Sequence, residues 1–271
     1  MKRSWYASPY ALWMVLFTVV PLLFVCWYAF TTPSGAFTLD NFSKIAQPSY
    51  LLVLWDSLRL ALYCTALCLL IGYPAAYFLA SRDFSRAQSL VVLIIVPMWM
   101  NFLLRTYAMM TLLEDNGVLN TLMRAVGLPG MKMIGTEGAV VLGMVYNYLP
   151  FMVLPIYTVL KKMDYSVIEA AQDLGCNPLQ VVSKVVLPMS IPGVVSGITM
   201  VFMPAVTTFS ISRLLSSGMV YLVGDMIEDY FISMNNRNVG SSISLVMLVL
   251  IILSIGFLRK VDPDNEGGGL W

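Results

Sequence analysis

The sequence predicts an all-α, polytopic membrane protein with six transmembrane helices, and two observations support this prediction. Of its 271 residues, 59% are hydrophobic and only 11% are charged, whereas soluble domains carry about 25% charged residues. The apolar residues gather in blocks of about 20, and a helix of that length crosses a hydrocarbon core of about 30 Å. We therefore predict that the lipid bilayer surrounds this chain.

Six blocks meet this criterion, and each is expected to form one spanning helix. They are Tyr10–Phe30, Ser57–Ala80, Ser89–Leu113, Gly138–Leu160, Ile191–Leu215 and Ser242–Leu258. The first follows Lys2 and Arg3, is too long for a signal-peptide core and lacks a small-residue cleavage site, so we expect an uncleaved anchor. Before the second block, Leu51–Trp55 is predicted as a short segment on the outer membrane surface, because Asp56 and Arg59 interrupt the apolar run.

The distribution of basic residues orients these spans. With the N-terminus in the cytoplasm, nine of the 16 basic residues fall on short inner segments. These are Lys2, Arg3, Arg82, Arg86, Lys161, Lys162, Lys184, Arg259 and Lys260. Because short cytoplasmic segments are enriched in lysine and arginine, we expect both termini to be cytoplasmic.

Five of the six blocks contain proline, which removes a backbone hydrogen bond and bends a helix. The prolines are Pro21, Pro74, Pro97, Pro150, Pro155 and Pro204. Bent helices that also carry polar residues, such as Asn101, Arg105 and Asn147, suit a bundle that encloses a cavity. The alternative is the general tolerance of membrane helices for proline.

The composition excludes several kinds of chemistry. The chain contains no histidine, so it has no histidine base, proton relay or metal ligand. Cys64 and Cys68 could hold a soft metal, but small packing residues are the simpler interpretation, and we predict no metal site. A net charge of +1 gives no general attraction to nucleic acid. No glycine-rich phosphate-binding loop with lysine occurs, so we predict no enzyme activity or bound cofactor, and any ATP hydrolysis must come from another chain.

An ion-coupled carrier is the less favoured alternative. Such carriers usually hold the coupling ion with an acidic residue near the middle of a span. In this sequence, the aspartate and glutamate residues fall in predicted loops or at predicted helix ends.

The predicted cytoplasmic loop at residues 161–188 is the most informative segment. Ser166 stands three residues before Glu169, the spacing of a capping box that starts a helix, and Gly175 is suited to end it. The apolar stripe of this helix is Val167, Ile168, Ala170, Ala171 and Leu174. A helix of about eight residues is marginal alone, so we expect it to dock on another protein. A hairpin on lipid is disfavoured because Glu169 and Asp173 would face an anionic surface.

A second short helix is expected directly after the first. Asn177 is a suitable N-cap, and Pro178 then occupies the first helical position. This helix is expected to stop before Pro188.

The spacing in this loop resembles a known family. Glu169, Ala170 and Ala171 are followed by three residues, Gly175, nine residues, Val185, one residue, and Leu187–Pro188. This is similar to the EAA loop of bacterial ABC-importer permeases, EAA-x3-G-x9-I-x-LP, with valine in place of isoleucine. The resemblance implies a coupling helix that inserts into a cleft of an ATPase subunit. It assigns this coupling to Glu169, Ala170, Ala171, Asp173 and Gly175.

Other segments resemble the spermidine/putrescine permeases of this family, among them GYPAAYFLA, LPFMVLPIYTVLKKMD and LPMSIPGVVSG. The resemblance implies the type I importer fold in one domain over residues 1–271, with residues 10–30 as a peripheral first span and residues 57–258 as a five-helix core. It also implies a bacterial cytoplasmic membrane, a second homologous permease, two ATPase subunits that bind ATP and magnesium, and an extracytoplasmic binding protein. Permeases for sulfate, iron and aminoethylphosphonate have closely similar loops and remain alternatives.

A polyamine is a flexible polycation, so carboxylates and aromatic faces would attract it. The candidate carboxylates are Asp225, Glu228 and Asp229, between the fifth and sixth spans, with only Arg237 nearby. These acids could draw cations to the outer mouth of the path. Equally, they could solubilise a loop or contact the binding protein.

Four aromatic residues in the third and fourth spans are candidates for the same path. They are Trp99, Tyr107, Tyr146 and Tyr148. The alternative is that they face lipid or neighbouring helices, as most aromatic residues in membrane helices do. Arg105 and Arg213, expected at outer helix ends, would repel a polycation on the path and keep an anionic substrate as an alternative.

Overall fold

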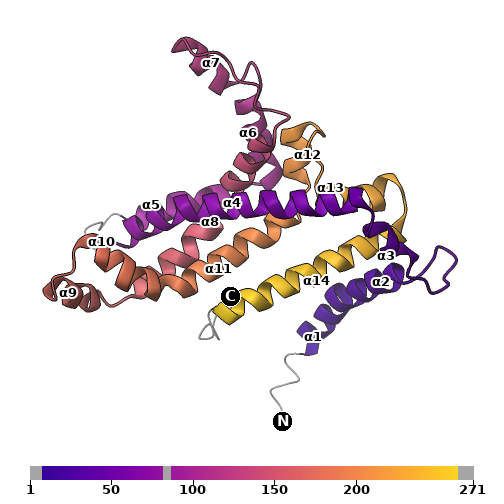
Figure 1. Cartoon of the computed structure of the whole chain (residues 1–271), viewed down its shortest axis with the longest axis horizontal. Coiled ribbons are helices and arrows are strands. Elements are labelled where there is room, and N and C mark those ends of the chain that lie inside the picture. The colour runs from indigo at the N-terminus through magenta and orange to yellow at the C-terminus, as the bar shows by residue number, and fades with distance from the viewer. Residues whose placement is uncertain (1–7, 82–86, 262–271) are drawn as a thin grey trace.

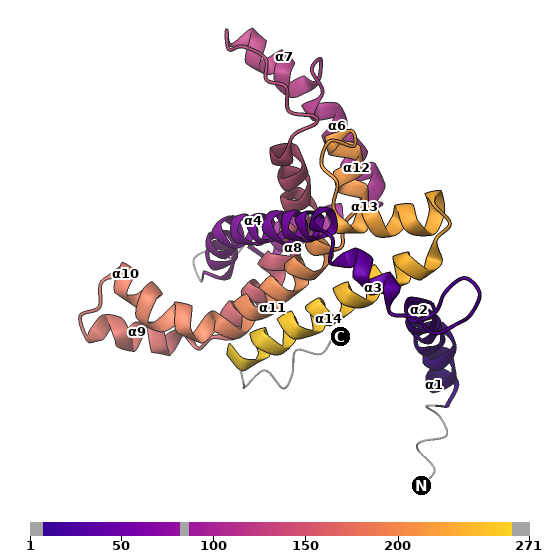
Figure 2. The same cartoon turned by 45° about the vertical axis from the view of Figure 1, so that its right-hand side comes forward.

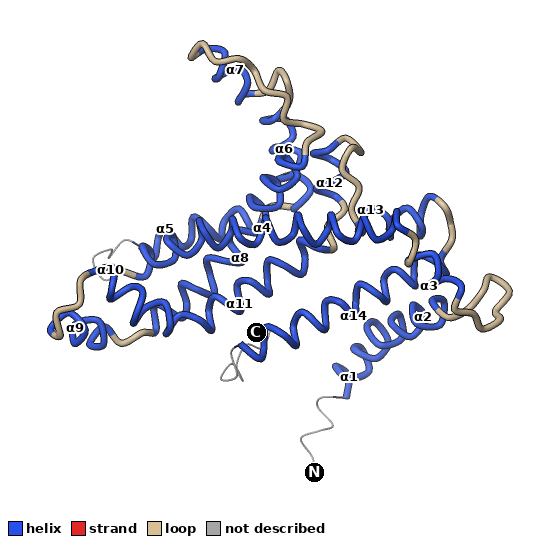
Figure 3. Tube along the Cα trace, in the orientation of Figure 1, coloured by secondary structure: helices blue, strands red, loops and turns tan. Residues whose placement is uncertain are grey.

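The computed structural model describes residues 8–81 and 87–261, and most of this part of the chain is helical (Figures 1 and 3). Within it, five helices are long and apolar enough to cross a membrane. They are Pro9–Ala29, Pro48–Ala80, Glu137–Lys162, Pro178–Val206 and Arg237–Gly256. A sixth crossing exists if Leu90–Trp99 and Phe102–Ala125, which are bent by 100° at their junction, act together as one span. The predicted all-α membrane fold is confirmed, with one span broken.

Three helices form the centre of the molecule: α4 (Pro48–Ala80), α8 (Glu137–Lys162) and α11 (Leu187–Val206) pack along one another. Glycine permits the close approach of α8 and α11, because a Cβ at Gly193 would lie 3.0 Å from the Cα of Ile156. Almost wholly buried side chains at this centre include Leu60, Met144, Met152, Ile156 and Val201. In a bilayer, such close packing rather than escape from water holds helices together.

Helix α4 is 33 residues long and begins at Pro48, so Leu51–Trp55 is part of it. The prediction of a separate surface segment there is wrong. Asp56 and Arg59 interrupt the apolar run but lie within the helix, where they pair with each other at 3.3 Å, as neighbours one turn apart can do. Arg59 also reaches Glu137 of α8 at 2.6 Å.

The third predicted span is broken, so the prediction of one continuous helix over Ser89–Leu113 is wrong. Its parts are α5 (Ala87–Ile95), the 3₁₀ helix η3 (Val96–Trp99) and α6 (Phe102–Leu113). Pro97 lies in η3, and Asn101 caps α6 by accepting a hydrogen bond from N of Leu103 at 2.8 Å. A proline followed by a capping residue ends one helix and starts another.

Beyond α6, the chain forms the short helix α7 (Val118–Ala125). Figures 1 and 2 both show α6 and α7 projecting from the bundle. The buried Asn120 fastens this projection, since its side chain donates to O of Glu114 and O of Met131 and accepts from N of Met131. The projecting segment is therefore held in its conformation by its own hydrogen bonds.

The fifth predicted span ends earlier than expected. Helix α11 stops at Val206, and the chain resumes as α12 (Ser210–Ser216), so the prediction of a helix to Leu215 is wrong. The carbonyls of Thr207 and Thr208 turn toward α13 (Val223–Glu228) instead of continuing the helix. A Cβ at Gly224 of α13 would lie 2.6 and 2.4 Å from these two oxygens.

The first span packs on the last helix. It consists of α1 (Ser8–Met14), the π-helix η2 (Val15–Val19) and α2 (Val20–Ala29), and α2 packs along α14 (Arg237–Val261). Asn238 of α14 donates to O of Tyr28 at 3.1 Å and to O of Thr31 at 2.6 Å. From α3 (Asp40–Ile45), Asn41 donates to O of Ala29 and O of Thr31, both at 3.0 Å. These amides tie the end of α2 to α3 and α14.

The π-helix η5 (Asp229–Ser233) leads into α14, which begins before the predicted Ser242. Among the basic residues that orient the predicted spans, Lys2, Arg3, Arg82 and Arg86 lie outside the described residues. The side chains of Arg259 and Lys260 also lie outside the described part of the chain.

Candidate functional site

The predicted cytoplasmic loop contains a short helix, α9 (Tyr165–Asp173), directly after α8. Asp164 caps it by accepting a hydrogen bond from N of Ser166 at 3.0 Å, and this bond holds the pKa of the Asp164 carboxyl below its usual range. The predicted capping box that begins at Ser166 is wrong, because Ser166 already lies inside the helix. A carboxylate suits the positive end of a helix better than a hydroxyl, so the helix starts earlier.

Gly175 ends α9 as predicted. Its φ is +86°, a left-handed conformation that glycine adopts without steric cost. Its amide donates to O of Gln172 at 2.9 Å, and the amide of Cys176 donates to O of Ala171 at 3.1 Å. These two bonds satisfy carbonyls that the end of a helix would otherwise leave free.

The next helix, α10 (Pro178–Val181), starts as predicted but does not stop as predicted. Asn177 accepts from N of Gln180 at 2.9 Å, and the Gln180 side chain accepts from N of Asn177 at 3.0 Å. The chain then passes through a π-helical turn, η4 (Val182–Val186), into α11 without a break at Pro188. The wider π turn relieves the clash that a proline ring makes with the preceding turn of an α-helix.

Most of α9 faces outward. Of the residues assigned to coupling, Glu169, Ala170, Asp173 and Gly175 are exposed and Ala171 is buried. Of the predicted apolar stripe, only Ala171 and the half-buried Ile168 turn inward, while Leu174 and the nearby Leu179 keep 87% and 81% of their surface exposed. A contiguous exposed apolar patch can mark a protein docking surface, and these two leucines leave apolar surface exposed on this loop.

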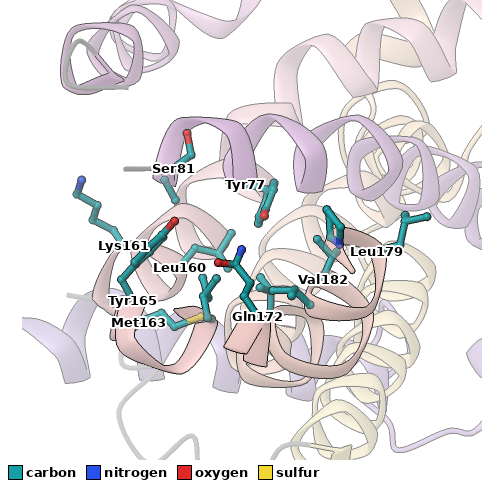
Figure 4. Close-up of a pocket in the computed structure, with 14 residues that line it drawn as sticks. Tyr77, Ser81, Leu160, Lys161, Met163, Tyr165, Gln172, Leu179 and Val182 are labelled. Atoms are coloured by element: carbon teal, nitrogen blue, oxygen red, sulfur yellow. The ribbon is translucent and has the colours of Figure 1, made fainter. Parts of the chain in front are cut away.

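A cavity of about 490 Å³ lies between α9 and the ends of the central helices (Figure 4). Tyr77 of α4 and Ser81, which directly follows that helix, line one side of it, and Tyr165 and Gln172 of α9 line another. Because α9 borders this space, its packing in this chain is mainly against α10 and η4. The helix is therefore positioned by its caps and turns more than by the bundle.

Asp225, the first of the acids predicted for the substrate path, is buried at the start of α13. It accepts hydrogen bonds from the hydroxyl of Ser212 at 2.7 Å and from N of Leu222 at 2.9 Å. Burial raises the pKa of this carboxyl, against the opposing effect of the two hydrogen bonds. Asp225 thus links α12 to α13.

Glu228 and Asp229 lie on either side of an arginine. Nη1 of Arg213 is 2.8 Å from Oε2 of Glu228, and Nη2 is 2.8 Å from Oδ1 of Asp229. The hydroxyl of Tyr221 also donates to Asp229 at 2.9 Å. The expectation that Arg237 is the only basic residue near these acids is wrong, because the break after α11 turns α12 and Arg213 toward them.

The predicted path aromatics differ in exposure. Trp99 is 80% exposed, Tyr107 48%, Tyr146 44% and Tyr148 7%. The hydroxyl of Tyr148 donates to O of Pro204 at 3.4 Å, so this side chain links α8 to α11. Trp99, Tyr107 and Tyr146 keep open surface that Tyr148 lacks.

A buried polar group that no sequence motif marks lies at the junction of α6 and α8. Arg105, expected at an outer helix end, lies in the first turn of α6 with 6% of its surface exposed. On α8, the fully buried Asn147 donates to Oγ1 of Thr106 at 3.4 Å and to O of Gly143 at 2.9 Å. The signal was visible as polar residues within apolar blocks, but only the fold brings these blocks together.

The sequence matches a known family over most of its length. The family described as "Binding-protein-dependent transport system inner membrane component" matches residues 69–266. The chain belongs to this family. Its similar relatives include the spermidine/putrescine transport system permease protein PotB of Haemophilus influenzae, 36% identical over 90% of this chain and 88% of the relative. PotB of Escherichia coli is 35% identical over 90% of this chain and 91% of the relative.

Solved structures confirm the type I importer fold of this inner membrane component. A bacterial ABC transporter involved in the import of the acidic polysaccharide alginate contains a similar chain, with a TM-score of 0.75 and 17% identity over 96% of this chain and 97% of that one. A chain of the MetNI methionine ABC transporter gives a TM-score of 0.59 and 18% identity over 78% of this chain and 93% of that one.

Proposed function

We propose that this chain is a pore-forming permease subunit of an ATP-driven importer that carries spermidine or putrescine across the bacterial cytoplasmic membrane. The main observation in support of this proposal is the similarity to relatives named as spermidine/putrescine permeases, at 35–36% identity over 90% of the chain. The two termini would lie in the cytoplasm, on the same side as α9.

The exposed surface of α9 supports the coupling part of this proposal. Glu169 and Asp173 are exposed on a helix that is fastened at both ends, by Asp164 and by Gly175. An ATPase subunit that grips this helix can transmit movement to the central bundle, because η4 and α11 continue directly from α10. The other partners would be a second permease, a second ATPase subunit and a binding protein outside the membrane.

Charge reversal in α9 tests the coupling role. We expect Glu169→Lys to abolish uptake and substrate-stimulated ATPase activity in the assembled transporter, while the protein still inserts into the membrane. Asp40→Lys is the matched control, because Asp40 is also exposed but lies in α3. Unchanged uptake and ATPase activity in Glu169→Lys would argue against coupling through α9.

The substrate class needs a separate measurement. Uptake of labelled spermidine should be competed by unlabelled putrescine and not by sulfate. Competition by sulfate would reject the polyamine assignment.

Replacing Glu228 and Asp229 with Gln and Asn tests whether these acids recruit the cation, since each lies only partly exposed beside Arg213. We expect the apparent KM for spermidine to rise. An unaltered KM would show that these acids do not recruit the cation and that their role is to form ion pairs with Arg213.

A further inference from the structure

An unpaired charge lies at the junction where the broken third span meets α8. Arg105 is 6% exposed, and its Nε has no hydrogen-bond partner. Within the described residues, no carboxylate forms an ion pair with this guanidinium. Asn147, whose side chain donates to Oγ1 of Thr106 next to Arg105 in the sequence, is fully buried, and its Oδ1 also has no partner.

A buried arginine without a counter-charge is an expensive arrangement. Arginine cannot escape the cost by losing its proton, because its pKa is too high. Charged side chains inside membrane helices are accordingly found paired or facing a functional path. The counter-charge for Arg105 is therefore expected from outside the described chain.

The depth of this junction indicates what kind of molecule can supply the charge. Asn147 lies ten residues after Glu137 in α8, so it is about 15 Å along a helix that is about 39 Å long over its 26 residues. With the start of α8 at the outer membrane surface, as the proposed topology has it, a soluble protein docked on that surface would not reach this depth. The side chain of another membrane protein would.

Helix α6 also offers a surface for such a protein. Leu103, Leu104 and Tyr107 keep 44%, 62% and 48% of their surface exposed on the same helix as Arg105. Figures 1 and 2 show that α6 leaves the bundle and projects from it. An exposed apolar face beside a buried unpaired cation fits a membrane helix that carries one carboxylate.

We propose that Arg105 forms an ion pair with a carboxylate of the second permease subunit, which joins α6 to that subunit within the membrane. This inference rests on the proposed function, because only a transporter with two permeases provides this partner. The guanidinium can bind a carboxylate through two parallel hydrogen bonds. The pair would therefore position α6 against the second permease and also neutralise the charge of Arg105.

A double-mutant cycle tests the pair in the complete transporter, purified through a tag on this chain. We expect Arg105→Gln to lower the amount of co-purifying second permease about tenfold or more, because the carboxylate would remain buried and unpaired. Arg105→Lys should lose less, since lysine retains the charge. Arg124→Gln is the control, because Arg124 is exposed on α7 and donates to a backbone oxygen of Asp115.

The second half of the cycle replaces each acidic residue in the spans of the second permease by its amide. One of these variants should reproduce the loss, and adding Arg105→Gln to it should cause no further loss. If Arg105→Gln alone fails to insert, Arg105→Glu combined with arginine at that acidic position should restore the complex.

Two results would overturn the proposal. In the first, combining Arg105→Gln with any acidic variant of the second permease lowers the amount of co-purifying second permease by the sum of the two separate effects. In the second, the isolated subunit is stabilised by chloride relative to gluconate in an Arg105-dependent way, so that an inorganic anion is the counter-charge. Because the cycle measures assembly and not uptake, a transporter of another solute could still show the pair, and a polyamine importer could lack it.

Discussion

At the scale of single residues, Asp225 shows that position decides what a carboxylate does. The sequence places it in an acidic cluster with Glu228 and Asp229, and composition alone suggests attraction of cations. In the structure, Asp225 is 3% exposed and holds the hydroxyl of Ser212 and the amide of Leu222. Its neighbours in sequence are instead partly exposed beside Arg213.

We expect Asp225→Ala to lower the free energy of unfolding by about 1–3 kcal/mol, because a buried amide and hydroxyl would lose their shared acceptor. Denaturant unfolding in detergent measures this change. Asp115→Ala is the matched control, since Asp115 is exposed in a loop. Equal stability of Asp225→Ala and the wild type would show that the two hydrogen bonds contribute nothing.

Asp229 gives a prediction for pH. Burial opposes its ionisation, but hydrogen bonds from Tyr221, Arg213 and Ser233 prevail and lower its pKa. A lowered pKa in the folded state means that the stabilisation is complete above the unfolded value of about 3.9 and is lost as the pH falls through the folded value. The melting temperature of the wild type should therefore fall more between about pH 5 and about pH 3 than that of Asp229→Asn. Parallel curves would contradict this.

At the scale of elements, α9 depends on the conformation of one glycine. A Cβ at Gly175 would meet no atom within 4 Å, so substitution affects the backbone conformation alone. We expect Gly175→Ala to cost about 1 kcal/mol and to reduce the coupling of ATPase activity to uptake, because it moves the end of α9. Gly35→Ala is the matched control, since Gly35 has a φ of +85° and equally open surroundings. If both variants impaired coupling equally, the orientation of α9 would not be the cause.

The elements also show which features a sequence can predict. The end of α9 at Gly175 and the start of α10 at Asn177 depend on neighbouring residues only, and both predictions are confirmed. The end of α11 depends on a contact between the carbonyls of Thr207 and Thr208 and the distant Gly224. No local pattern marks such a contact, so the fifth span was predicted too long.

At the scale of the whole molecule, the glycines of α11 determine how closely the central helices pack. A Cβ at Gly193 would lie 3.0 Å from both the Cα of Ile156 and the carbonyl oxygen of Pro155, which are backbone atoms and cannot move aside. We expect Gly193→Leu to destabilise the protein by about 1–3 kcal/mol or more and to lower the yield of folded subunit. Gly256→Leu is the control, since no atom lies within 4 Å of its Cβ position. A normal melting temperature for Gly193→Leu would show that the helices can separate freely.

The candidate site could be predicted from sequence only where it is local. The coupling loop is one continuous segment, so its motif revealed it directly. The surroundings of the acids depend on Arg213, which approaches Asp229 from 16 residues away in sequence through the turn of α12. The junction at Arg105 likewise joins α6 to Asn147 of α8, since Thr106 and Asn147 are separated by 41 residues.

The packing of α2 against α14 has a consequence for biogenesis. Asn238 holds the carbonyl of Thr31 across 207 residues of sequence. Because the ribosome synthesises the chain from its N-terminus, α2 enters the membrane long before α14 has been translated. Until synthesis of α14 is complete, α2 lacks the helix along which it packs, and nascent chains stalled before Arg237 should be the preferred targets of membrane proteases.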